Sequence, residues 1–167
     1  LDALFGRRTA DDTGPLLGRI PDGERVYAIG DIHGRFDLLR QLHADIAADR
    51  KGDGQKETVI YLGDYIDRGV DSPQVIDFLL DLATDGDVKR ICLLGNHEAM
   101  LLGLLDNPQG AGRWLTNGGQ TTLHAYGVAS PRVPAAPADM ETARQALRER
   151  LQISHLNFLQ DLKLCHQ

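Results

Sequence analysis

Three short apolar runs recur in the N-terminal part of the chain. They cover residues 25–29, 58–62 and 91–94, and each is followed directly by a glycine and a polar loop. Short runs of apolar and β-branched residues that stop at turn-forming residues are typical of buried strands. We therefore expect three strands, each ending at its glycine.

A helical spacing of apolar residues follows each of these runs. After the first run, four apolar positions lie three and four residues apart: Phe36, Leu39, Leu42 and Ile46. This spacing places them on one face of a helix, and we expect His43 on the exposed face. A second helix is expected to begin at Ser72, with Pro73 in its first turn, and a third to cover residues 98–105.

Alternating strands and helices predict an α/β fold with a parallel sheet that helices cover on both faces. We expect one domain over residues 25–167, preceded by a lead-in segment over residues 1–24. Residues 130–138 are rich in proline and predict a surface loop. Beyond this loop, residues 139 to 164 indicate either one long helix or two consecutive helices with Ser154 as the cap between them.

The composition and net charge limit the kinds of molecule that the protein is expected to bind. The chain has 167 residues, of which 42% are hydrophobic and 25% charged, as is usual for one globular domain. Its formal net charge of -6 argues against nucleic acids and anionic membranes as partners. Two cysteines are too few for a disulfide framework, and no apolar stretch has the length of a membrane span. We expect a cytoplasmic protein, and its oligomeric state stays open.

Side chains that bind metals follow all three expected strands: Asp31 and His33, Asp64 and Asp67, Asn96 and His97. Ligands of open α/β sheets bind at the carboxyl ends of the strands. One ion could bind both Asp31 and His33, and Asp64 could bridge it to a second ion at Asn96. Oxygen and imidazole donors without thiolates suit Mn²⁺, Fe or Zn²⁺. Two such ions about 3.5–4 Å apart stabilise the attacking and leaving oxygens of a phosphoryl displacement.

Simpler interpretations exist for single residues of this set. Asp and Asn after glycine often form turns by bonding to their own backbone. Asp67 and Arg68 could form an ordinary ion pair within a loop, and Glu98 is expected to be a helix first-turn carboxylate rather than a catalyst. Trp114 either lines a substrate groove or packs against another part of the protein. Because all three strand ends carry such residues, we favour the metal site.

Three motifs carry a resemblance to a known family: Gly-Asp-Ile-His-Gly at residues 30–34, Gly-Asp-Tyr-Ile-Asp-Arg-Gly at 63–69 and Gly-Asn-His-Glu at 95–98. In this order and spacing they resemble the N-terminal signatures of the phosphoprotein phosphatase (PPP) family of metallophosphoesterases. The later segment 114–127 is similar to the bacterial serine/threonine phosphatases and symmetrical diadenosine tetraphosphatases of that family. The resemblance implies a calcineurin-like metallophosphoesterase sandwich, here its N-terminal βαβαβ half with a helical C-terminal segment.

The resemblance also implies a role for each residue. The residues expected to bind two divalent ions, with manganese preferred, are Asp31, His33, Asp64 and Asn96. Asp64 would bridge the two ions of this dinuclear centre. His97 would be the general acid, oriented by Asp67, and Arg68 would bind the phosphate.

The implied reaction is hydrolysis of a phosphomonoester, most simply phosphoserine or phosphothreonine on a protein, by a hydroxide that bridges the two metals. The alternative is a symmetrical dinucleoside polyphosphate hydrolase, which uses the same metal core. Family members place two further metal-binding histidines and a second phosphate-binding arginine in a C-terminal half that residues 1–167 do not supply. A protein that ended near Gln167 would be a catalytically incomplete binding module.

Overall fold

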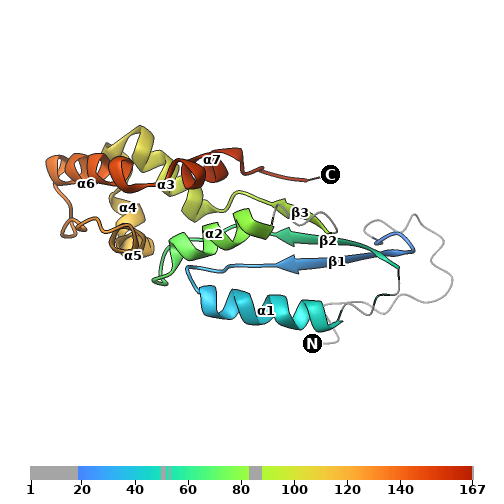
Figure 1. Ribbon diagram of the computed structural model, residues 1–167. Coiled ribbons are helices and arrows are strands. Elements are labelled where there is room, and N and C mark those ends of the chain that lie inside the picture. Colours follow the sequence, from blue (N-terminus) through green and yellow to red (C-terminus); the bar gives the residue numbers. More distant parts are fainter. Residues whose placement is uncertain (1–18, 50–51, 53, 83–87, 167) are drawn as a thin grey trace, which may run out of the picture.

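The computed structural model describes residues 19–49, 52, 54–82 and 88–166 (Figure 1). Its elements in chain order are β1 (Glu24–Ile29), α1 (Phe36–Asp49), β2 (Lys56–Tyr61), α2 (Ser72–Leu82), β3 (Lys89–Cys92), α3 (Asn96–Asp106), a 3-10 helix (Pro108–Gly110), α4 (Gly112–Trp114), a π-helical turn (Leu115–Gly119), α5 (Gln120–Ala125), α6 (Pro137–Arg150) and α7 (Ile153–Asp161). The predicted α/β fold is confirmed, as are its three strands and the helices between them. Most of the expected lead-in segment lies outside the described residues.

The three strands form a parallel sheet in the order β1-β2-β3. Ile29 at the end of β1 is paired with Tyr61 at the end of β2, and Tyr61 is paired with Cys92 at the end of β3. The strands therefore end in register. The three polar loops that follow them leave the sheet side by side at one edge.

Helices α1 and α2 lie on the same face of this sheet (Figure 1). The Tyr27 hydroxyl donates to Asp49 at the end of α1 over 2.8 Å, and the Tyr61 hydroxyl lies 2.7 Å from His43 Nε2. On the opposite face Ala28 is exposed, and Leu62 just beyond β2 is 51% exposed. The expectation that helices cover both faces is wrong for the described residues. Each strand is added on the same side of the previous one through a right-handed crossover, so the connecting helices lie on the same face of the sheet. A helix would lie on the other face only if the direction of strand addition reversed.

The buried face of α1 differs from the expected one by a single position. Leu39 and Ile46 are buried as predicted, but Leu42 is 39% exposed. His43 takes its place, because its ring stacks on Tyr61 and meets the edge of Phe78. Burial lowers the pKa of His43, which favours the neutral ring. The expectation that His43 lies at the surface is therefore wrong, and the Tyr61 hydroxyl is the polar partner that makes its burial acceptable.

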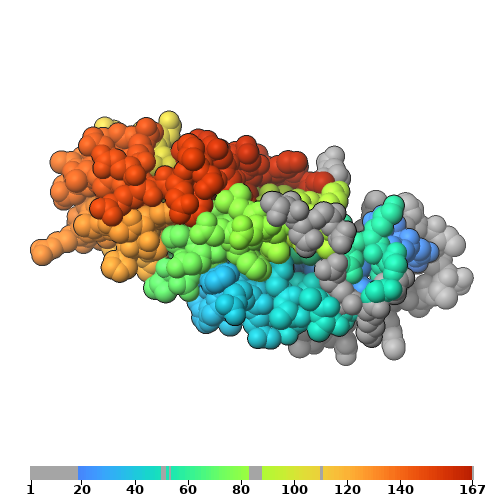
Figure 2. All heavy atoms as spheres, viewed as in Figure 1, coloured from blue at the N-terminus to red at the C-terminus, as the bar shows by residue number. Residues whose placement is uncertain are grey.

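The remaining helices gather beyond the carboxyl ends of the strands (Figure 1). Residues 139–164 form two helices, α6 and α7, but the residue that caps α7 is Gln152 and Ser154 lies inside the helix. Buried His155 on α7 is hydrogen-bonded at both ring nitrogens. Its Nδ1 lies 2.7 Å from the Tyr126 hydroxyl, and its Nε2 lies 2.8 Å from Asp77 Oδ1 on α2. These bonds help to hold the C-terminal helices, red in Figure 2, against α2.

Helices α4 and α5 and the π-helical turn between them have no counterpart in the sequence prediction. Two adjacent glycines, Gly118 and Gly119, interrupt the apolar spacing in this segment, and Gly118 has a φ of 109°. Glycine lowers helix propensity, so the pattern alone does not indicate a helix. None of the helices within the described part of the chain combines the length and apolar character that a membrane-spanning segment requires.

Two adjacent leucines of α1 test this packing. Leu39 is 2% exposed and Leu38 is 55% exposed. We expect Leu39→Ala to lower the free energy of unfolding by about 2–5 kcal/mol, because it leaves a cavity in the core. Leu38→Ala, the matched control, should change it by no more than about 0.5 kcal/mol. Urea unfolding of both variants measures the difference, and equal losses would contradict the assignment of the core face.

Candidate metal and phosphate site

The loops after β1 and β2 are joined through their backbones. The backbone N–H groups of Ile32 and His33 donate to the carbonyl oxygen of Asp64 over 3.0 and 2.9 Å, and that of Gly34 donates to Tyr65 over 2.8 Å. These bonds continue the sheet pairing past the ends of the strands. They fix His33 and Asp64 relative to each other before any ligand binds.

The loops after β2 and β3 approach so closely that side chains are excluded at two glycines. A Cβ atom on Gly63 would collide with the backbone of Gly95, and one on Gly95 would collide with the backbone nitrogen and carboxylate of Asp64. Gly63 also has a φ of 107°, which disfavours other residues. The strand-ending glycines found in the sequence are therefore needed for this contact between loops.

Glu98 holds these loops together from inside the protein. Its carboxylate accepts four backbone N–H groups, from Asp64, Tyr65, Ile66 and Gly95, over 2.7–3.2 Å. The bond to Gly95 caps α3, as expected for an acidic residue in the first turn. The three bonds to the β2 loop are not visible in the sequence, because their partners lie over thirty residues away. Burial raises the pKa of Glu98, and the backbone donors oppose this shift.

Ligand atoms of three side chains converge at this junction. Those of His33, Asp64 and His97 all lie within 4.8 Å of one another. His33 Nδ1 lies 2.9 Å from the carbonyl oxygen of Ile66, which directs the ring and leaves Nε2 with its lone pair free. His33 Nε2 is buried and has no hydrogen-bond partner among the described residues, while Asp31 approaches it to 3.6 Å. A buried imidazole nitrogen facing carboxylates fits a divalent metal ion.

The structure brings the predicted ligands His33 and Asp64 together, and the predicted ligand Asp31 lies 3.6 Å from His33 Nε2. Asn96 is the first residue of α3 and is exposed, next to His97 in the chain. Its place among the ligands stays a prediction. His97 was expected to be an acid rather than a ligand, and its ring meets that of His33 edge to face with 4.6 Å between the centroids.

Asp67 and His97 form a buried pair. His97 Nδ1 lies 2.7 Å from Asp67 Oδ2, and the two side chains are 2% and 0% exposed. Asp67 Oδ2 also accepts from the indole N–H of Trp114 over 2.7 Å, and Oδ1 accepts from the Thr122 hydroxyl over 2.6 Å. Burial raises the pKa of Asp67, whereas the bonds from Thr122, His97 and Trp114 lower it. The pair leaves His97 Nε2 as the ring atom directed toward the site.

Trp114 and Thr122 are residues that the sequence left without an assignment. Trp114 is buried and its indole N–H donates to Asp67, and it also lines a pocket of about 370 Å³ together with Met100 and Leu104. The hydroxyl of Thr122 also accepts the backbone N–H of Asp67 over 3.0 Å. Both contacts join residues far apart in the chain. A tryptophan and a threonine at ordinary helical positions give no local signal of such a role.

Arg68 is the exposed cation of the site. Its Nη2 lies 3.4 Å from His97 Nε2, and its backbone N–H donates to the carbonyl oxygen of Gly118 over 3.2 Å. The interpretation of Asp67 and Arg68 as a mutual ion pair is wrong, because the side-chain partners of the Asp67 carboxylate are His97, Trp114 and Thr122. Arg68 is instead positioned to reach an anion bound beside His97.

Four residues of the site other than glycine have a left-handed backbone. The φ angles are 48° at His33, 56° at Asp64, 72° at Asp67 and 66° at Arg68. Such conformations are uncommon outside glycine and are usually held by surrounding structure at functional sites. Here the surrounding structure is the network of loop hydrogen bonds and the Glu98 carboxylate.

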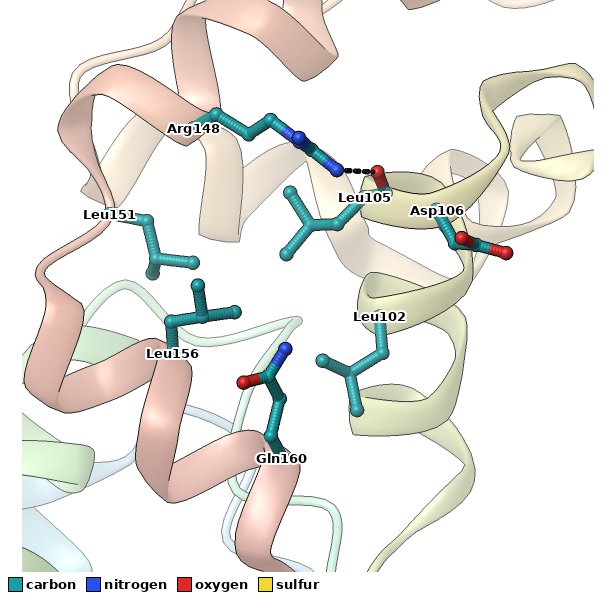
Figure 3. Close-up of a pocket in the computed structure, with 7 residues that line it drawn as sticks. All are labelled: Leu102, Leu105, Asp106, Arg148, Leu151, Leu156 and Gln160. Carbon is teal, nitrogen blue, oxygen red and sulfur yellow. Dashed lines mark hydrogen bonds between the residues drawn. The ribbon is translucent and has the colours of Figure 1, made fainter.

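A separate pocket lies between α3, α6 and α7 and takes no part in this site. It has a volume of about 470 Å³, and Leu102, Leu151 and Leu156 form much of its lining (Figure 3). Arg148 at its edge donates to the carbonyl oxygen of Leu105 over 2.6 Å. This bond satisfies one of the free carbonyls at the end of α3, so it is explained by helix packing.

Residues 24–161 match the family model of the calcineurin-like phosphoesterases. The chain therefore belongs to the calcineurin-like phosphoesterase family. The resemblance to the phosphoprotein phosphatases, drawn from the three motifs, is confirmed at this level. The family binds divalent metals, in agreement with the donor set at the strand ends.

Three relatives illustrate the range of the family. A zinc-dependent endopolyphosphatase of Saccharomyces cerevisiae is 29% identical over 144 residues, which is 86% of this chain and 42% of that protein. A symmetrical bis(5'-nucleosyl)-tetraphosphatase of Legionella pneumophila (strain Lens) is 42% identical over 79 residues, 47% of this chain and 26% of that protein. A serine/threonine-protein phosphatase of Arabidopsis thaliana is 38% identical over 75 residues, 44% of this chain and 7% of that protein. The chain thus spans less than half the length of each relative.

The role of Glu98 is open to a direct test. We expect Glu98→Gln to lower the free energy of unfolding by about 2 kcal/mol or more, because an amide group replaces an acceptor oxygen and leaves buried N–H groups without partners. The bound metal per chain should fall as well, since the loop that carries Asp64 is released. Thermal unfolding and elemental analysis measure the two effects. Glu149→Gln, at an exposed position of α6, is the control, and equal behaviour of the two variants would refute the role.

Proposed function

We propose that this chain forms the metal and phosphate site of a hydrolase for phosphate monoesters. One observation carries the proposal: the buried Nε2 of His33, which has no hydrogen-bond partner among the described residues, faces Asp31 and Asp64 directly beside the Asp67–His97 pair. A metal-ligand set and a buried acid pair share one strand-end junction. This combination suits hydrolysis of a phosphate ester.

The residues that would hold two divalent ions are Asp31, His33, Asp64 and Asn96. The donors are oxygen and imidazole, so manganese is proposed, with iron or zinc as alternatives. When bound, the ions supply an activated water molecule and neutralise charge on the phosphate. The Ile66 carbonyl keeps His33 in the tautomer that such binding requires.

The residues of the chain itself act on the phosphate and on the leaving group. Arg68 is exposed and reaches the space beside His97 Nε2, where its guanidinium would bind the phosphate oxygens. His97 would donate the proton on Nε2 to the departing oxygen. Asp67, fixed by its own donors, holds the ring through Nδ1 and stabilises its charged form.

A buried acid favours one class of substrate. Serine and threonine leave as strongly basic alkoxides and need a proton in the transition state, whereas a phosphoanhydride releases a weakly basic phosphate. We therefore propose phosphoserine and phosphothreonine on proteins as the substrates, in the cytoplasm. The second candidate is a dinucleoside tetraphosphate, which the name of the Legionella relative supports.

Substrate preference tests the proposal. The metal-loaded protein should hydrolyse a phosphoserine peptide with a kcat/KM at least about tenfold above that for diadenosine tetraphosphate. Removal of metal by a chelator should abolish both activities, and Mn²⁺ should restore them. The reverse preference would establish the second candidate. Turnover of neither substrate by the metal-loaded protein would refute the proposed function.

The acid role of His97 predicts a dependence on the leaving group. His97→Ala should lower kcat/KM for a phosphoserine peptide by about 10²–10⁴-fold and affect p-nitrophenyl phosphate far less, because nitrophenolate departs without a proton. Asp67→Asn should show the same bias more mildly. Arg68→Ala, the control, should lower both rates alike, since phosphate binding is common to both substrates. An equal drop in His97→Ala at unchanged metal content would exclude the acid role.

A further inference from the structure

Helices α4 and α5 contact Asp67 through two side chains with no assigned role. Trp114 Nε1 donates to Oδ2 over 2.7 Å and Thr122 Oγ1 to Oδ1 over 2.6 Å. With His97 Nδ1 also on Oδ2, both carboxylate oxygens are occupied by donors that converge from three directions. Because Asp67 is fully buried, no water can take over when a donor is removed.

The π-helical turn between α4 and α5 contacts the neighbouring residue, Arg68. The carbonyl oxygen of Gly118 accepts the backbone N–H of Arg68, and a Cβ atom on Gly118 would lie 2.7 Å from Arg68 Cγ. The aliphatic part of Arg68 therefore runs directly over the backbone of Gly118. The φ of 109° at Gly118 places a kink at this point, so two helical stretches meet at this glycine.

The indole of Trp114 is seated by a second glycine of this turn. A Cβ atom on Gly119 would collide with Cε2 and Cδ2 of Trp114, the two atoms shared by its rings, and would lie 2.8 Å from Nε1. The absence of a side chain at residue 119 lets the ring lie flat enough for its N–H to reach Asp67. The backbone of the segment is thus shaped around both contacts.

We propose that Trp114 and Thr122 are positioning residues that orient the Asp67 carboxylate toward His97, while Gly118 separately positions Arg68. The proposal rests on the proposed function. Different residues of one helical segment thus act on different steps. The hydrogen bonds from Trp114 and Thr122 assist proton donation to the leaving group, and Gly118 assists phosphate binding. A segment that only filled space would affect both steps together.

Thr122 offers the cleanest substitution. Thr122→Val removes the hydroxyl and keeps the shape, and Ser72 Oγ, 3.2 Å from the backbone nitrogen of Asp67, still accepts that N–H. The loss therefore falls on the carboxylate and on Ser72 Oγ, which lies 3.2 Å from the Thr122 hydroxyl. We expect kcat/KM for a phosphoserine peptide to fall about tenfold, the effect of one hydrogen bond to a charged group, while that for p-nitrophenyl phosphate falls less than about twofold. Thr122→Ser should restore both rates.

Gly118→Ala tests the other half of the proposal. Its side chain would displace Arg68, so both substrates should lose kcat/KM by the same factor, as in Arg68→Ala. A leaving-group bias in Gly118→Ala, or an equal loss for both substrates in Thr122→Val without rescue by serine, would overturn the division of labour. Trp114→Phe is the second variant for the Asp67 half and should reproduce the bias of Thr122→Val.

Two further readouts separate this proposal from folding and from the proposed function. Trp114 is the single tryptophan of the chain, so an unchanged emission maximum shows that the segment of Thr122→Val is intact. The downfield proton resonance of His97 Nδ1–H, identified by its loss in Asp67→Asn, should shift in Thr122→Val and return in Thr122→Ser. An unchanged resonance would overturn the positioning role even in a protein that hydrolyses neither substrate, whereas inactivity alone would refute only the proposed function.

Discussion

The Glu98 carboxylate is the interaction on which the rest of the site depends. Parallel strands end beside one another, but the segments that follow differ: a polar loop follows β2, whereas only Leu93, Leu94 and Gly95 separate β3 from α3. Glu98 accepts N–H groups from the loop after β2 and from the residue before α3, and so makes one unit of the two. The same carboxylate caps α3. Glu98 thereby holds the loop that carries Asp64 against the start of α3, where the backbone N–H of His97 donates to Asp64 Oδ1 over 3.1 Å.

The site contains strained backbone conformations, and a dense set of hydrogen bonds stabilises them. Left-handed conformations occur at His33, Asp64, Asp67 and Arg68, all in the loops after β1 and β2. Each such residue costs free energy of order 1–3 kcal/mol. The backbone bonds between the β1 and β2 loops and the contact with the π-helical turn offset this cost. Ligands held in this way need little rearrangement to bind a metal or a phosphate.

The α4–α5 segment contacts the Asp67–His97 pair, to which we assign proton donation to the leaving group. Its donors reach a carboxylate that is inaccessible to water, so the orientation of His97 is set by protein groups alone. An arrangement of this kind is useful when the leaving group needs a proton, and much less so when it does not. The proposed preference for alkyl phosphate esters rests on this feature rather than on the metal ligands, which would suit phosphoesters and phosphoanhydrides alike.

The sequence by itself determined the strands, the helices between them and the chemical types gathered at the strand ends, because these depend on local spacing and on the rule that parallel strands end at one edge. Only the tertiary structure decided which partners they meet. The exposure of Leu42 and the burial of His43 were settled by the ring of Tyr61 across the helix–sheet interface. The bonds of Glu98 to the β2 loop and of Trp114 to Asp67 join positions far apart in the chain, and no local pattern encodes such contacts.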